Sequence, residues 1–367
     1  MKDLFYYYPS LREKLPLLKL GDFPTPIQNL KKLSSLLKHN NLYIKRDDIS
    51  NNIYGGNKVR KLEFILADLI KHKKRVIITF GLAGSNYALA TTIHASEVGL
   101  KTVLMLLPQP NSYHLQENLL LDYNFGADLH QQNNTLFLTF DTGIQIVYQI
   151  FKTFSLPKII PPGGSSVIGI IGFVNAAFEL YEQIYNKEIP EPDFIYIPIG
   201  SMGSAVGLTL GFKILGLKSK IISIRVVDEK YANLKKMIRL FKKVNRYLNN
   251  LDKSFPIIKI KENDFQIKHN FFGHGYGLFT NEGNIAAKLM NEYEGIKLDG
   301  IYSAKAFAAL IDDIKKSNFN DKILLFWNTG NSIDLFKIAS EVNYHKLPHK
   351  FYSYFESSVQ ALEQKSN

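Results

Sequence analysis

Residues 194–204 run Phe-Ile-Tyr-Ile-Pro-Ile-Gly-Ser-Met-Gly-Ser and carry no charged side chain. The apolar part is rich in β-branched and aromatic residues, which is typical of a buried strand. The Gly/Ser part is typical of a tight turn, and residues 205–215 that follow have the composition of a helix. The stretch therefore predicts a strand, a turn and a helix in that order.

Two further windows without charged residues, 76–96 and 159–178, show the same order of apolar run, Gly/Ser turn and helix-like stretch. Repeated units of this kind are typical of α/β proteins with a mostly parallel sheet. None of the three windows predicts a transmembrane helix, because polar, Gly or Pro residues interrupt each one in its middle. Other strands are expected at residues 42–45, 102–107, 221–227 and 323–326.

The composition sets limits on size and function class. The 367 residues suffice for two domains, and we expect a smaller domain over residues 55–165 inserted into a larger one made of residues 1–54 and 166–367. Cys is absent, which excludes a disulfide scaffold, a cysteine-based metal centre and a cysteine nucleophile. The net charge of +12 comes from scattered Lys and Arg residues, so we expect no nucleic-acid partner. The N-terminus lacks the pattern of a signal peptide, which favours a cytoplasmic protein.

A strand, a turn and a helix in this order place several backbone N–H groups at the positive end of the helix, an arrangement that binds phosphate. The turn here is Gly200-Ser201-Met202-Gly203-Ser204. Glycines that only shape the turn are the structural alternative. A dinucleotide site is disfavoured, because the glycine spacing is not G-x-G-x-x-G and Met202 would crowd the pyrophosphate. A phosphate site and a purely structural turn both remain open.

A second candidate site is the run Gly55-Gly56-Asn57-Lys58-Val59-Arg60-Lys61-Leu62-Glu63. Two glycines end a polar loop, and Lys58 stands at the start of the helix expected over residues 58–70. An ammonium group is unfavourable at the positive end of a helix, so this position favours the neutral, nucleophilic amine. The alternative is a lysine at a helix start that points into water.

A third candidate, Ser85-Asn86, offers a hydroxyl and an amide at the end of the strand that begins at residue 76. Either residue also suits a helix N-cap. His345 and His349 have the spacing of a helical metal pair, but Pro348 between them argues against a helix, and we expect no metal site.

Taken together, these motifs resemble the pyridoxal-phosphate enzymes of the D-cysteine desulfhydrase and 1-aminocyclopropane-1-carboxylate deaminase family. Residues 55–63 carry the most specific part of the resemblance, which covers about residues 20 to 335. The other matches, in family order, are Phe23-Pro24-Thr25-Pro26, Lys45-Arg46-Asp47-Asp48, Ser85-Asn86, Pro162-Gly163-Gly164-Ser165, Gly200-Ser201-x-Gly203-Ser204-x-x-Gly207-Leu208, Gly275-Tyr276-Gly277, Glu294-Gly295, Tyr302-Ser303-x-Lys305-Ala306 and Asn328-Thr329-Gly330.

The resemblance implies a tryptophan synthase β-like fold of two α/β domains with mostly parallel sheets, the cofactor between them, and a homodimer. It implies that Lys58 holds pyridoxal 5'-phosphate covalently, that the 200–204 loop binds the phosphate, and that Asn86 binds the phenolic oxygen. Thr329 would meet the pyridine nitrogen. The implied catalytic residues are Lys58, Ser85, Tyr276 and Tyr302. The implied cofactor-binding residues are Lys58, Asn86, Gly200, Ser201, Met202, Gly203, Ser204 and Thr329.

Two positions separate the branches of this family. In the deaminase pattern the residue after the active-site Tyr is Glu and the Thr position is Leu, whereas this chain has Ser303 and Thr329. A neutral hydroxyl at the pyridine nitrogen gives a weaker electron sink, which suits β-elimination. The resemblance therefore implies a lyase that converts D-cysteine and water to pyruvate, sulfide and ammonia. The alternatives are cyclopropane opening, deamination of another amino acid, or a binding protein with reduced catalysis.

The sequence departs from the family pattern mainly on the side where the substrate is expected. Family members commonly have Gln before the Ser-Asn pair and His or Gln after it. The departing positions are Gly84, Tyr87, Met202, Ala304, Asn328 and Asn331.

Overall fold

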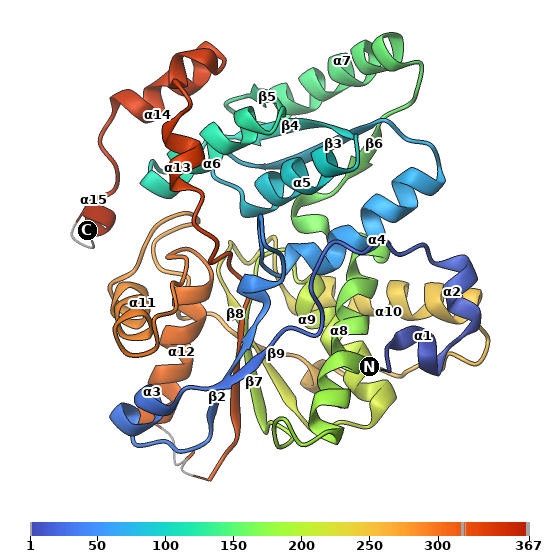
Figure 1. The fold of residues 1–367 in the computed structure, drawn as a ribbon, viewed down its shortest axis with the longest axis vertical. Coiled ribbons are helices and arrows are strands. Elements are labelled where there is room, and N and C mark those ends of the chain that lie inside the picture. The colour runs from blue at the N-terminus through green and yellow to red at the C-terminus, as the bar shows by residue number, and fades with distance from the viewer. Residues whose placement is uncertain (1, 317–318, 320, 365–367) are drawn as a thin grey trace. The chain divides into compact units, whose positions relative to one another are not determined.

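The computed structural model describes residues 2–316, 319 and 321–364 (Figure 1). Its contacts divide the chain into two compact units, one made of Met1–Phe64 and Ser165–Ser332, the other of Ile65–Gly164 and Ile333–Asn367. The sequence predicts the smaller domain over residues 55–165 and leaves residues 333–367 with the larger one. The structure instead groups those last residues with the second unit, because Leu347, Phe351 and Tyr354 join its hydrophobic core.

The described part of the first unit is built on a six-stranded sheet with the order β1-β2-β10-β7-β8-β9. All neighbours are parallel except β1 and β2. Its strands are β1 (Ile27–Asn29), β2 (Leu42–Arg46), β7 (Phe194–Ile199), β8 (Lys220–Arg225), β9 (Gln266–Lys268) and β10 (Leu324–Asn328).

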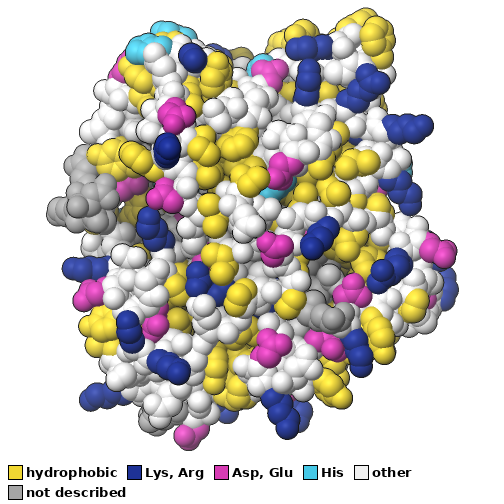
Figure 2. All heavy atoms as spheres, viewed as in Figure 1, with side chains coloured by type: hydrophobic (Ala, Val, Ile, Leu, Met, Phe, Trp, Pro, Cys, Tyr) yellow, Lys and Arg dark blue, Asp and Glu magenta, His cyan; other side chains and the backbone are white. Residues whose placement is uncertain are grey.

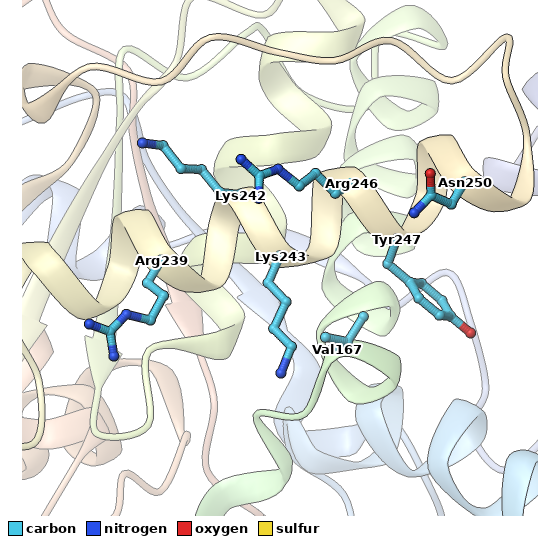
Figure 3. Close-up of a pocket in the computed structure, with 7 residues that line it drawn as sticks. All are labelled: Val167, Arg239, Lys242, Lys243, Arg246, Tyr247 and Asn250. Carbon is cyan, nitrogen blue, oxygen red and sulfur yellow. The ribbon is translucent and has the colours of Figure 1, made fainter.

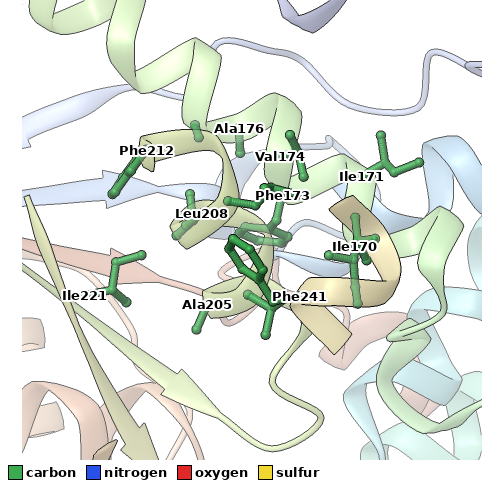
Figure 4. Packing of buried hydrophobic residues seen from close by; sticks show 14 of the residues in the cluster. Ile170, Ile171, Phe173, Val174, Ala176, Ala205, Leu208, Phe212, Ile221 and Phe241 are labelled. Carbon is green, nitrogen blue, oxygen red and sulfur yellow. The ribbon is translucent and has the colours of Figure 1, made fainter. Parts of the chain in front are cut away.

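Helices cover both faces of this sheet (Figure 1). On one face α8, α9 and α10 enclose a core in which Phe173, Leu208 and Phe241 are fully buried (Figure 4). On the other face α11 and α12 pack around Phe307 and Phe326. The helices of this unit are α1 (Leu4–Tyr7), α2 (Ser10–Lys14), α3 (Lys31–Leu37), α8 (Val167–Tyr185), α9 (Gly203–Leu215), α10 (Leu234–Leu251), α11 (Asn281–Glu294) and α12 (Ser303–Lys316).

Glycines let α8, α9 and the chain near Lys58 approach one another closely. A Cβ on Gly207 of α9 would lie 2.5 Å from the Cβ of Phe173, and one on Gly172 would lie 2.0 Å from the carbonyl oxygen of Arg60. Real side chains do not tolerate such distances, so glycine is required at both places. This contact fixes the start of α4 (Lys58–Lys71), which carries Lys58, against α8.

The second unit contains, in its described residues, a four-stranded parallel sheet with the order β5-β4-β3-β6. Side chains of β3 and β4 alternate between the two faces: Leu104 packs with the α5 and α6 side, and Met105 with the α7 side. The elements are β3 (Val76–Leu82), β4 (Lys101–Leu107), β5 (Asp128–Gln131), β6 (Lys158–Ile160), α5 (Asn86–Glu97), α6 (Tyr113–Asn124), α7 (Thr135–Thr153), α13 (Phe336–Ser340), α14 (Tyr352–Glu356) and α15 (Ala361–Gln364), with α4 entering from the first unit.

The predicted α/β class with mostly parallel sheets is confirmed. In the described chain, α8 has the length and composition of a membrane span, but 72% of its apolar window is buried inside the protein. It is therefore a core helix of the first unit.

Candidate functional site

Lys58 is the first residue of α4, directly after the loop that ends at Asn57. Gly56 in that loop has a φ of +101°, and a Cβ there would lie 2.8 Å from the carbonyl oxygen of Gly330. The Lys58 amine is half-buried and donates to Oδ1 of Asn57 over 2.8 Å. The open alternative of a lysine pointing into water is therefore wrong.

Burial lowers the pKa of the Lys58 amine to about 8, although the nearby carboxylate of Asp299 acts in the opposite direction. A substantial fraction of this amine is therefore neutral near physiological pH, which a lysine nucleophile requires. The position at the positive end of α4 favours the neutral form as well.

This pKa gives a measurable pH dependence. In protein freed of cofactor, acylation of Lys58 should rise with pH and reach half its maximal rate near pH 8, because only the neutral amine reacts. An ordinary lysine would show a midpoint near ~10.4. Mass spectrometry of the peptide that contains Lys58 measures this rate. The Asp299→Asn variant should move the midpoint to lower pH, and a wild-type midpoint near 10 would contradict the assignment.

The loop after β7 leads into the N-terminus of α9, where the first N–H groups have no acceptor within the helix. Met202 takes a left-handed conformation with a φ of +64°, as a glycine would, and its side chain is buried in the hydrophobic core. It therefore does not lie over the loop, as the sequence suggested it could. Gly203 is required, because a Cβ there would lie 2.3 Å from Oγ of Ser165.

Hydroxyl groups line the same loop. Ser165 donates to Oγ of Ser201 over 2.8 Å and accepts from the backbone N–H of Gly203 over 3.2 Å. Asn57 donates from Nδ2 to Oγ of Ser204 over 3.0 Å. The side chain of Asn57 thus contacts both the Lys58 amine and the 200–204 loop, and this joins the two motifs in the first unit.

Lys61 is a residue of this site to which the sequence analysis assigned no role. It lies three residues after Lys58 on α4, is buried, and donates to Oγ of Ser165 over 3.1 Å. Burial, and then the charge of Lys58, lower its pKa well below the ordinary range. The i, i+3 spacing of the two lysines is a signal that could have shown them on one side of α4.

Tyr276 and Tyr302 form a pair in which the two hydroxyls share a hydrogen bond and the rings meet edge-on at a centroid distance of 6.0 Å. Tyr302 also lies near the 200–204 loop, since a Cβ on Gly200 would be 3.5 Å from the Tyr302 ring. Burial raises the pKa of Tyr276 to about 12 and that of Tyr302 well above its usual value. Both hydroxyls therefore keep their protons at neutral pH.

The loop after β10 brings Thr329 to the first unit's candidate site. The backbone N–H of Asn57 donates to the carbonyl oxygen of Thr329 over 3.2 Å. The preceding Asn328 is fully buried, and among the described residues its Nδ2 has no hydrogen-bond acceptor. Asn331 accepts from the N–H of Gly55 over 2.8 Å, so this departure from the family pattern holds the loop before Lys58.

Ser85 and Asn86 lie in the second unit, at the carboxyl end of β3. Ser85 is the N-cap of α5, and its hydroxyl accepts from the N–H of Ala88 over 3.2 Å, as the structural alternative predicts. Oδ1 of Asn86 accepts from Nδ2 of Asn118 over 3.0 Å and lies 2.6 Å from Nε2 of His114. These contacts orient the amide so that its Nδ2 donor remains for a ligand.

Packing within the second unit explains why a glycine stands at position 84. A Cβ at this position would lie 2.6 Å from Nε2 of Gln109, a buried side chain that enters from the loop after β4. A larger residue at position 84 is excluded while Gln109 occupies this space. Tyr87 is also buried, and its ring fits against Gly164, where a Cβ would lie 2.7 Å away.

A cavity of about 460 Å³ lies beside α10 in the first unit (Figure 3). It shares no lining residue with the predicted site, and its charged members are all exposed to solvent. The lining residues are Val167, Arg239, Lys242, Lys243, Arg246, Tyr247 and Asn250. Elsewhere on the face drawn in Figure 2, Lys and Arg side chains are scattered among other types.

Comparisons with solved structures support the fold. The crystal structure of a homologue of ACC (1-aminocyclopropane-1-carboxylate) deaminase matches this chain with a TM-score of 0.75 and 29% identity. The match covers 95% of this chain and 98% of the homologue's chain. A threonine deaminase isoform from Solanum lycopersicum matches 92% of this chain and 87% of its own, with a TM-score of 0.59 and 18% identity. The second similarity shows the fold alone.

Curated relatives cover nearly the whole chain. A D-cysteine desulfhydrase from Serratia proteamaculans is 31% identical over 347 residues, which are 91% of this chain and 100% of the relative. A Pyrococcus furiosus protein provisionally named a 1-aminocyclopropane-1-carboxylate deaminase is 33% identical over 336 residues, 91% of this chain and 97% of the relative. The family model described as "Pyridoxal-phosphate dependent enzyme" matches residues 18–330. The chain therefore belongs to the pyridoxal-phosphate-dependent enzymes.

Proposed function

We propose that this protein is a pyridoxal-phosphate-dependent lyase that eliminates the β-substituent of a small D-amino acid, with D-cysteine as the first candidate. The observation that carries the proposal is the Asn57 side chain, which bonds to the Lys58 amine at one end and to Ser204 of the phosphate-type loop at the other. A covalently held, phosphorylated aldehyde needs this combination of a lysine amine and an anion-binding loop in one site.

The residues of the first unit fit the phosphate end of the cofactor. The N-terminus of α9 with the hydroxyls of Ser201 and Ser204 would bind the phosphate, and Lys61, through its contact with Ser165, would add positive charge when an anion is present. Asn86 would donate from Nδ2 to the phenolic oxygen. The hydroxyl of Thr329 would bind the pyridine nitrogen.

The side chains would divide the chemistry among them. When bound, pyridoxal phosphate supplies the electron sink for the carbanion that α-deprotonation creates. The Lys58 amine, once free, would remove the α-proton, for which a pKa near 8 is well matched. The Tyr276–Tyr302 pair shares one hydrogen bond and therefore has a second hydroxyl proton for the substrate. Ser85 would lie near the substrate carboxylate or take part in proton transfer.

D-cysteine is favoured because a relative that carries the name D-cysteine desulfhydrase matches 91% of this chain and because Thr329 and Ser303 differ from the deaminase pattern. In the reaction the α C–H and the C–S bonds break, and with one water the products are pyruvate, sulfide and ammonia. We also propose a homodimer in the cytoplasm. An activity like that of 1-aminocyclopropane-1-carboxylate deaminase is the second candidate, which the Pyrococcus furiosus relative favours.

The test is to incubate the loaded enzyme with D-cysteine, L-cysteine, D-serine and 1-aminocyclopropane-1-carboxylate and to measure 2-oxo acids and sulfide. We expect pyruvate and sulfide in equal amounts from D-cysteine, at a rate at least tenfold above that from the L-isomer. The Lys58→Ala protein controls for the non-enzymatic reaction. 2-Oxobutyrate from the cyclopropane substrate alone would favour the second candidate. Absence of any 2-oxo acid, with a cofactor still bound, would favour a binding protein.

A further inference from the structure

Helix α7 of the second unit exposes most of its large apolar side chains and buries several polar ones, which is unusual for a helix at the surface. On the side that packs toward the sheet, Leu138 and the half-buried Ile146 are apolar, whereas Thr142, Gln149 and Thr153 are polar. A helix that covers a sheet normally does the opposite and exposes its polar side. The large apolar side chains of α7 that face away from the sheet are Leu136, Phe137, Phe140, Ile144, Val147, Tyr148, Ile150 and Phe151. We call these eight residues the α7 face.

The exposed area of this face is larger than a stable monomer usually leaves in water. Phe137, Phe140 and Phe151 are 58%, 71% and 75% exposed, and Phe154 just beyond the helix is 92% exposed. With about 200 Å² for each phenylalanine side chain, these four rings alone expose on the order of 600 Å². The five other members of the α7 face are 36% to 75% exposed and bring the total above the roughly 800 Å² that each partner contributes to a stable complex.

Among the described residues, no packing contact requires a glycine at position 143, in the middle of α7. A Cβ at this position would meet no atom of the described structure within 4 Å, and alanine there would favour the helix. Glycine in the middle of an apolar helix face permits another backbone to approach closely. The glycine therefore marks the point where a second helix would cross α7.

The charge of the face selects the partner. Residues 135–154 contain only Asp141 and Lys152 as charged residues, and Asp141 already accepts from Gln132 over 2.7 Å. A helix that binds a lipid surface usually carries many Lys or Arg residues on its polar side. A two-fold interface brings the same patch of both subunits together, and a face with so few charges would place no large like charges against each other there.

We propose that the α7 face binds a second copy of this chain, with the two α7 helices crossing near Gly143. This inference adds the surface to the homodimer proposed above and does not depend on the activity. The loss of activity and the loss of the dimer are therefore separate outcomes.

The mass of the wild-type holoenzyme in solution is the first test, by analytical ultracentrifugation at about 10 µM. We expect twice the mass of the 41.9 kDa chain. The double variant Phe140→Gln and Phe151→Gln should weaken the dimer by at least about a hundredfold, because exposed aromatic anchors dominate such interfaces. Phe336→Gln is the matched control, since Phe336 is 69% exposed but lies on α13. It should leave the mass unchanged.

The Gly143→Ala variant distinguishes two effects of this position: its effect on the stability of α7 itself and its effect on the contact between the two crossing α7 helices. In the monomeric double-variant background it should raise the melting temperature, because alanine favours the helix. In the wild-type background it should weaken the dimer by about tenfold, because the added methyl group stands at the crossing. A monomeric wild type, a dimer that survives the double substitution, or a dimer tightened by Gly143→Ala would each overturn the proposal. Sedimentation of a monomeric wild type with phosphatidylglycerol vesicles would assign the face to lipid instead.

Discussion

Replacing Lys58 with alanine is expected to reduce turnover of the preferred amino acid by at least about a thousandfold, because the variant lacks both the covalent attachment and the base for the α-proton. The amine is half-buried, is bonded to Asn57 and has a pKa lowered to about 8 by burial. These properties support the role of α-proton base that we propose for the Lys58 amine. The measurement is 2-oxo acid formation under saturating substrate.

Two controls make this result specific. The far-ultraviolet circular dichroism spectrum of the variant should match that of the wild type, because the Lys58 amine bonds to the adjacent Asn57 and not to the buried ion network. Added methylamine should restore part of the activity, since a small free amine can remove the proton in place of the side chain. A variant that retains more than about a tenth of the wild-type rate would show that another group is the base.

The largest effect on stability is expected at Glu179 of α8. Glu179 is buried and accepts from Arg60 over 2.8 Å and from Lys45, while Arg60 also pairs with Asp47 at 2.7 Å. Trp327 donates to Asp47 over 2.7 Å. Removing one partner of a buried ion network leaves a charge unpaired, and we expect Glu179→Gln to lower the free energy of unfolding by about 3–5 kcal/mol.

The control is Glu182→Gln on the same helix. Glu182 is also buried, but its partner is the neutral hydroxyl of Tyr7 at 2.9 Å, from which glutamine can still accept. Its loss should be about 1 kcal/mol or less. Urea unfolding measures both variants. Equal, small effects would show that the ion network adds nothing to stability. Arg60 lies two residues after Lys58, so a weakened network should also loosen the start of α4.

The pKa of the Glu179 carboxyl group allows a prediction of how the stability of the protein depends on pH. Burial alone would raise the pKa of Glu179, but the charges and hydrogen bonds of Arg60 and Lys45 outweigh it and hold the pKa at about 2. Its stabilising contribution is therefore complete above the ordinary value of 4.5 and is lost as the pH falls toward 2. The difference between wild type and Glu179→Gln should shrink over that interval.

Much of the fold follows from local sequence. The apolar run and Gly/Ser turn at residues 194–204 predict β7 and the start of α9, because β-branched residues and glycines favour these conformations locally. The four-residue strand β5 and the three-residue strand β9 have no such signal, since they form only by pairing with the edges of sheets. Residues 333–367 joined the second unit through long-range packing, which no local pattern reveals.

The candidate site also contains residues that local sequence indicates and residues that only long-range contacts reveal. Lys58 and the 200–204 loop could be found from the sequence because helix starts and glycine turns constrain residue choice. Lys61 and Ser165 could not be given roles, because their contact joins segments about a hundred residues apart. The left-handed Met202 shows that a position suited to glycine can hold another residue when the core takes up its side chain.

We propose that Lys58 carries the cofactor covalently. The most direct test is to reduce the pyridoxal-phosphate-loaded protein with borohydride, digest it and locate the modified lysine by mass spectrometry. We expect one stable adduct, on the peptide that contains Lys58 and at Lys58 rather than at the neighbouring Lys61, with no adduct in Lys58→Ala. An adduct on Lys61 or Lys305 in the wild type, or no adduct at all, would contradict it.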